Sequence, residues 1–196
     1  GAPAWSPPVL ASSEAGRAAQ NPVLFHPPGS PAGALRLYHT SQRSGFGQGT
    51  SDVRELASED GGKTWTAPAT IFDDHGIFVR NRIVVMPNGD WLLPCYYTPD
   101  GFGRFETHYS VMKLSSDKGA SWAEYAMTAK GEFLAQPTVA RVPGTESSVI
   151  AFFRDRRAQA IYAARSDDGG KTWSKARNTA LPNNNSGIQL CQLRSG

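Results

Sequence analysis

Short apolar runs recur along the chain, and turn-forming segments separate them. The run at 91–98 is mostly apolar on both faces, as a central strand of a sheet should be. The four residues before it, Pro87-Asn88-Gly89-Asp90, have the Asn-Gly core typical of a β-hairpin. Helix signals are nearly absent, so the pattern predicts an all-β fold. We expect strands at 21–25, 35–40, 53–57, 82–86, 91–98, 109–114, 136–142, 149–154 and 161–165.

An eight-residue unit occurs three times, beginning at residues 58, 115 and 166. Its shared pattern is Ser-x-Asp-x-Gly-x-(Thr/Ser)-Trp, and each copy follows one of the expected strands. A repeat every ~50 residues indicates an array of similar supersecondary units. The shared positions are Ser58, Asp60, Gly62, Trp65, Ser115, Asp117, Gly119, Trp122, Ser166, Asp168, Gly170 and Trp173.

The unit has a structural interpretation. An Asp carboxylate accepts nearby backbone N–H groups in a tight turn, and Gly adopts backbone angles that other residues resist. The Ser and Thr hydroxyls can close the same loop, and the Trp ring begins the next strand and enters the core. We therefore expect Asp60, Asp117 and Asp168 to maintain the fold and not to act in catalysis.

At these residues the chain resembles the sialidase-like (BNR-repeat) proteins, whose Asp box has this pattern. The resemblance implies a sialidase-like β-propeller with one four-stranded blade per repeat. The 196 residues then supply about three to four blades of a full form of six. We expect residues 1–17 to be a poorly ordered lead-in to a single propeller region, and 188–193 to begin another blade. The chain would then fold poorly without the later blades.

The resemblance also implies a site in which arginines hold the carboxylate of an acidic sugar. Arg154 ends an apolar strand shortly before an Asp box, where the family places such an arginine; alternatively it pairs with Asp155. Arg43 follows the second strand of the first blade, where family sequences have another arginine, although an ordinary loop arginine fits equally. Arg82 begins an inner strand as Arg-Ile-Val, which is similar to the family's Phe-Arg-Ile-Pro.

Two departures from the family concern catalysis. Gln136 lies where sialidases have the Glu that activates the Tyr nucleophile, and Gln cannot act as a base. The Phe-Arg-Ile-Pro opening is missing from the first inner strand. Asp74 or His75, just before the second inner strand, is then our choice for a general acid. Asn185 and Ser186 offer amide and hydroxyl groups suited to sugar hydroxyls, or they form a surface turn.

Composition excludes several other classes. The formal net charge is +3, acids and bases are interspersed, and no Lys/Arg run predicts nucleic-acid binding. No apolar stretch approaches the ~18 residues of a membrane span. No His/Cys/Glu spacing resembles a zinc site, and no cofactor motif occurs, so we expect neither metal nor cofactor. Cys95 and Cys191 can pair or stay free, and the sequence does not indicate a compartment.

The resemblance therefore implies a sialidase-like glycoside hydrolase that acts on a terminal acidic sugar, with an anionic carbohydrate as its partner. One alternative is a propeller that binds a glycan or a protein without catalysis. Another is a propeller polysaccharide lyase that uses His and Tyr as base and acid. The fold alone does not decide among them.

Overall fold

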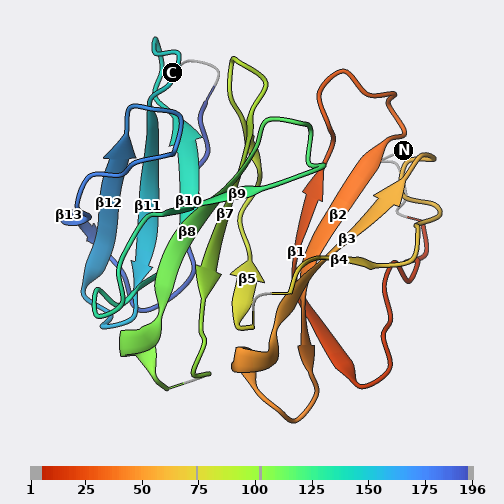
Figure 1. The fold of residues 1–196 in the computed structure, drawn as a ribbon, viewed down its shortest axis with the longest axis horizontal. Helices are drawn as coiled ribbons and strands as arrows, with labels where there is room; N and C mark the ends of the chain where they lie inside the picture. The colour runs from red at the N-terminus through yellow and green to blue at the C-terminus, as the bar shows by residue number, and fades with distance from the viewer. Residues whose placement is uncertain (1–5, 74, 102, 194–196) are drawn as a thin grey trace.

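A computed structural model describes residues 6–73, 75–101 and 103–193. Three antiparallel sheets lie side by side, the N-terminal sheet at the right of Figure 1 and the C-terminal sheet at the left. Each sheet is one blade, and the chain builds the blades in order. The fold is therefore the expected all-β, sialidase-like arrangement of four-stranded blades.

The strands follow one another from the inner to the outer edge of each blade. Blade 1 contains β1 (Arg17–Phe25), β2 (Leu35–Arg43), β3 (Asp52–Ser58) and β4 (Ala69–Phe72). Blade 2 contains β5 (Ile77–Val79), β6 (Val84–Val85), β7 (Trp91–Tyr97), β8 (Tyr109–Ser115) and β9 (Ala123–Ala126). Blade 3 contains β10 (Leu134–Arg141), β11 (Val149–Asp155), β12 (Ala160–Ser166) and β13 (Arg177–Pro182). Two short 3-10 turns, η1 (Gln48–Thr50) and η2 (Phe105–Thr107), lie in the loops.

The innermost strand of each blade is irregular. In blades 1 and 3 the pairing shifts register between Gln20 and Val23 and between Ala135 and Thr138. In blade 2 the strand is interrupted between β5 and β6, so Arg82 lies in the break and does not begin a strand as expected. A bulge redirects side chains away from the ladder, which is common beside functional sites.

The three Asp boxes form one kind of turn, as expected. In the first, the Asp60 carboxylate accepts hydrogen bonds from the backbone N–H of Thr64 at 2.9 Å and from its hydroxyl at 2.7 Å. The Ser58 hydroxyl donates to Asp60 at 2.9 Å and accepts from the backbone N–H of Gly62 at 2.9 Å. The first and third box tryptophans precede β4 and β13 by several residues, so the Trp does not start the next strand there.

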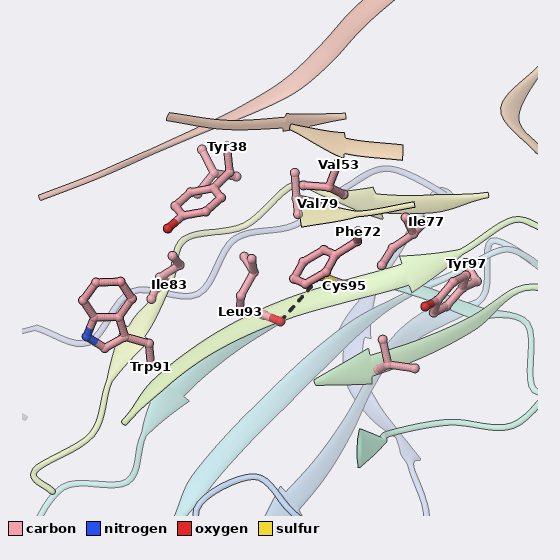
Figure 2. Close-up of a cluster of buried hydrophobic side chains, with 12 residues drawn as sticks. Tyr38, Val53, Phe72, Ile77, Val79, Ile83, Trp91, Leu93, Cys95 and Tyr97 are labelled. Atoms are coloured by element: carbon pink, nitrogen blue, oxygen red, sulfur yellow. Dashed lines mark hydrogen bonds between the residues drawn. The ribbon is translucent and has the colours of Figure 1, made fainter. Parts of the chain in front are cut away.

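Apolar clusters join neighbouring blades. Between blades 1 and 2 the core contains Tyr38, Val53, Val79 and Leu93, which Figure 2 shows facing one another. Cys95 belongs to the same cluster and is a free, buried thiol, whereas Cys191 is free and exposed. A second cluster, centred on Leu92, Met112, Leu134 and Phe153, joins blades 2 and 3. These clusters hold the neighbouring blades against one another.

Both flanking segments contact the blades. Strand β1 begins at Arg17, and the segment before it is bound to blade 1, since Glu14 pairs with Arg54 at 3.1 Å and the Ser12 hydroxyl lies 3.0 Å from His39 Nε2. Ser12 and Glu14 therefore contact the sheet, whereas residues 6–10 are exposed. Residues 188–193 run beside β10, where the Leu190 N–H donates to the Thr138 hydroxyl at 2.9 Å, but they form no strand.

Candidate functional site

Strand register brings three equivalent residues to the same height of adjacent blades. The second strand of each blade pairs its first residue with the Ser of the Asp box: Leu35 with Ser58, Trp91 with Ser115, and Val149 with Ser166. Five residues further along these strands are Thr40, Tyr96 and Arg154. Because the blades pack side by side, residues from different blades meet at this level. The repeat thus places Tyr96 next to Arg154.

Gln136 connects these two side chains. Arg154 Nη1 donates to Gln136 Oε1 at 3.0 Å, and Gln136 Nε2 donates to the Tyr96 hydroxyl oxygen at 3.3 Å. Arg154 Nε donates to Asn185 Oδ1 at 2.7 Å. Asp155 does not pair with Arg154, because its carboxylate contacts Arg157 Nε at 2.9 Å. Arg154 is therefore held in place by neutral groups that leave its charge uncompensated.

The bulge of β10 explains why Gln136 reaches this position. Its φ of 52° lies in the left-handed region, which is uncommon for a residue other than glycine and is enriched at functional sites. Asn81, at the break of the blade 2 inner strand, donates to the carbonyls of Pro137 at 2.8 Å and Gln136 at 3.3 Å. These bonds hold the bulge between two blades and direct the Gln136 side chain toward Tyr96.

Tyr96 is almost fully buried beneath this group. Its ring stacks on Phe78 with centroids 5.1 Å apart, and Ala135 completes the cluster. Burial raises the pKa of Tyr96, while the hydrogen bond from Gln136 and the charges of Arg156, Arg154 and Arg80 act in the opposite direction. The phenol is therefore neutral at physiological pH, in a cationic environment.

Arg80 is a member of the group that the sequence pattern did not identify. Its side chain is exposed, and its charge acts on both Tyr96 and Arg154. It lines a depression of about 320 Å³ with Asn81, Gly187 and Gln189. The segment Arg80-Asn81-Arg82 contains two arginines. The strand expected at 82–86 favoured Arg82 as the site residue, and Arg80 was missed.

The charges around Tyr96 are all of one sign. Burial and the neighbouring Arg80 lower the pKa of Arg154, and burial together with Arg154 lowers the pKa of Arg156 to about 10. Within the described part of the chain, no carboxylate contacts Arg80, Arg154 or Arg156. Like charges gathered without counter-ions favour an anionic ligand, and a guanidinium is the group that best matches a carboxylate.

Other predicted site residues lie outside this cluster. Arg43 is exposed at the end of β2, where its backbone N–H donates to the Thr50 hydroxyl at 3.1 Å and its carbonyl accepts from the Phe46 N–H at 3.2 Å. Arg82 Nη1 lies 4.0 Å from Cys191 Sγ, beside Arg80 and away from Gln136. The Ser186 side chain is exposed, and its carbonyl accepts from Asn183 Nδ2 at 3.1 Å.

Of the two proposed acids, only His75 lies within the described residues, and it is not joined to the cluster there. His75 is 79% exposed, and its Nδ1 lies 4.0 Å from Asp52 Oδ1 of blade 1. Asp74 lies outside the described residues. No recorded interaction connects His75 with Arg154, so their catalytic assignment stays a prediction.

In the ranges that the structure covers, no three His, Cys, Asp or Glu residues gather to hold a metal ion. Helices long and apolar enough to cross a membrane are also absent from those ranges.

Comparisons with solved structures support the fold. The chain is similar to a Hadza microbial sialidase, with a TM-score of 0.70, 17% identity, and coverage of 91% of this chain and 38% of that protein. It is similar to the Trypanosoma rangeli sialidase solved with sialic acid (TM-score 0.60, 16% identity, 80% and 27% coverage). It is also similar to a GH43 β-1,3-galactosidase (TM-score 0.63, 17% identity, 86% and 35% coverage).

The chain thus spans less than half the length of each of these three proteins, and the low identities establish the fold alone. A search of curated proteins finds no match. The model of one sequence family, described as a BNR repeat-like domain, matches residues 1–196. Together with the three Asp boxes and their blades, this match shows that the chain belongs to the BNR repeat-like family of sialidase-like propellers.

Proposed function

We propose that this chain is part of a sialidase-like glycoside hydrolase that acts on a terminal acidic sugar, and that Arg154 binds the carboxylate of this sugar. The observation that carries the proposal is the uncompensated charge of Arg154. Its two recorded partners, Gln136 and Asn185, are neutral amides that orient the guanidinium without neutralising it. Its pKa is lowered mainly by burial, as expected for a cation that lacks an anionic partner.

The surrounding residues have separate roles in this proposal. Arg80, exposed at the adjoining depression, contributes a second guanidinium to the carboxylate. When a ligand binds Arg154 in place of Asn185 and Gln136, these two amides form hydrogen bonds with sugar hydroxyls, as donors or acceptors. Asp74 or His75 remains our choice for the general acid, delivered from the loop before β5. The similarity to the sialidases is a similarity of fold, and it supports this substrate class only to that extent.

The test measures the release of 4-methylumbelliferone from a 4-methylumbelliferyl sialoside by the complete gene product that contains this chain. We expect turnover in the wild type and a loss of at least about tenfold in kcat/KM in Arg154→Ala, equal to ~1.4 kcal/mol or more. Arg43→Ala is the matched control, because it removes an exposed arginine outside the cluster. Equal turnover in the Arg154 and Arg43 variants would reject the site.

A non-catalytic glycan-binding propeller is the second candidate, and Gln136 specifically favours it. Gln136 donates to the Tyr96 hydroxyl, and an amide cannot take the phenol proton as a Glu carboxylate at this position could. In that case the folded gene product would bind N-acetylneuraminic acid through Arg154 but would hydrolyse no sialoside.

A propeller lyase is the third candidate, because His108 and Tyr96 both lie near arginines of the cluster. A lyase would remove the proton on the carbon beside the carboxylate and break the glycosidic C–O bond at the next carbon. The neighbouring sugar leaves with the oxygen, which takes up a proton, and the cleaved sugar becomes unsaturated. Ultraviolet absorbance from that product during digestion of a polyuronate, abolished in Tyr96→Phe, would favour the lyase over both other candidates.

A further inference from the structure

Among the residues that the structure describes, Arg156 is a buried cation that lacks both a counter-ion and a partner for its Nε. It follows β11 in the turn before β12, where its backbone N–H donates to the Phe133 carbonyl at 2.9 Å. The residue is only 8% exposed, and its Nε has no hydrogen-bond partner. A buried guanidinium in this state is costly unless a ligand or water satisfies it.

His108 presents a second unsatisfied atom close by. Its side chain is fully buried; Nε2 lies 3.4 Å from the Gly101 carbonyl, and Nδ1 has no partner within the described ranges. Phe105 joins the two residues, since the Arg156 guanidinium lies 5.2 Å over its ring and the His108 ring meets it edge-on at 5.4 Å. The pair therefore spans the junction between the β7–β8 loop of blade 2 and the β11–β12 turn of blade 3.

Two of the three acids in and beside these loops are already engaged, and the charge of the third, Asp100, acts on Arg104. Asp155 binds Arg157 at 2.9 Å, and Glu106 binds Arg104 at 2.7 Å. Burial and the Arg156 charge lower the pKa of His108, which the Gly101 carbonyl and Glu106 only partly oppose. Positive charge is thus concentrated at Arg156, next to Arg154 and without neutralisation by the described residues.

We propose that Arg156 and His108 form a second oxyanion subsite, which takes a carboxylate or sulfate group on the sugar adjacent to the one that Arg154 holds. This inference rests on the proposed function and narrows its substrate to glycans with acidic groups on neighbouring sugars. Arg156 supplies the N–H donors, and His108 becomes a further donor at Nδ1 when it is protonated. Phe105 keeps the two groups at a fixed separation.

The first test uses inorganic sulfate, so it does not depend on any glycan activity. The pKa of His108 is followed by NMR of the histidine ring carbons in the complete gene product, with and without sodium sulfate. An anion beside the imidazole favours its protonated form, so sulfate should raise the pKa of His108 by roughly half a unit or more. Arg156→Gln should abolish the rise, and Arg104→Gln, which removes an exposed arginine of the same loop, should retain it.

The second test compares sialyllactose with the same trisaccharide carrying a sulfate on the galactose, by calorimetry. We expect the wild type to bind the sulfated form at least about fivefold more tightly than the unsulfated form. Arg156→Gln should bind the two forms with equal affinity. Arg156→Lys keeps the charge without the planar fork and should retain part of the preference, which separates a charge effect from misfolding.

The outcomes separate the two proposals. If sulfate leaves the pKa of His108 unchanged in the wild type, or if Arg156→Gln shows the same rise, the subsite is rejected and a buried water is the partner of these atoms. If the sulfate effect is present but Arg154→Ala binds sialyllactose as the wild type does, the subsite stands and the proposed function fails.

Discussion

Gln136 shows how one residue determines the chemistry open to the site. Its amide donates to Tyr96 and accepts from Arg154, so it joins a phenol and a cation without adding charge. A carboxylate at this position would pair with Arg154 and occupy the guanidinium that we propose binds the ligand. Competition for Arg154 thus sets a condition that we expect in this chain: an anion binds more tightly while residue 136 is neutral.

This condition predicts the effect of Gln136→Glu. The new carboxylate should form a charge-assisted pair with Arg154 and weaken binding of N-acetylneuraminic acid by about tenfold, or ~1.4 kcal/mol. Calorimetry of the complete gene product measures the change, and Gln42→Glu, a change of the same type in blade 1, serves as the control. Stronger binding in the Gln136 variant would contradict our account of the site.

Gly187 provides a second test at single-residue scale. A Cβ added there would overlap the Arg80 guanidinium, which is the mobile end of a long side chain. Gly187→Ala should therefore displace Arg80 and weaken acidic-sugar binding by roughly threefold to tenfold, with little loss of stability. Asn184→Ala, at an exposed neighbouring position, is the control. Unchanged binding would show that Arg80 does not contribute.

At the scale of elements, the Asp box is a turn stabilised by an ionised carboxylate. The hydroxyl and backbone N–H of Ser121 bind Asp117 at 2.6 and 2.8 Å and lower its pKa to about 2. In the third box, burial opposes the shift, but hydrogen bonds from Thr172 prevail and the pKa of Asp168 is also about 2. The turn is thus coupled to the ionisation of its Asp.

The sign of this coupling predicts acid sensitivity. The folded-state pKa of Asp117 lies below the unfolded value of about 3.9, so its stabilisation is present above pH ~4 and is lost as the pH falls toward 2. Asp117→Ala should lower the melting temperature by a few degrees at pH 6, and the difference from the wild type should shrink by pH 2.5. A difference that does not change with pH would contradict the role of the charge.

The elements also show what the sequence could predict. The boxes and the inner, second and third strands were predicted from the repeat and the apolar runs, because both are local features. No bounds were predicted for the outer strands β4, β9 and β13. Strand β5 and the break after it were missed, since the apolar run at 82–86 predicted one continuous strand. The bulge of β10, which Asn81 stabilises, lay inside the strand expected at 136–142. Such irregularities depend on contacts between blades, and no local pattern encodes them.

At the scale of the whole molecule, the site arises where two blades meet. Arg154, Gln136 and Asn185 were predicted individually, and the structure joins them. Tyr96, Arg80 and Arg156 were not predicted, because their proximity depends on how blades 2 and 3 pack. The three-blade array also explains why Arg43 and His75, both associated with blade 1, lie apart from the cluster.

The central claim is that Arg154 recognises a sugar carboxylate, and one comparison tests it without requiring catalysis. Calorimetry would measure binding of N-acetylneuraminic acid and of its methyl ester to the complete gene product and to Arg154→Ala. We predict that the wild type binds the acid at least about tenfold more tightly than the ester, and that the variant binds both equally weakly. A wild type that does not distinguish acid from ester, or a variant that keeps the preference, would contradict the claim.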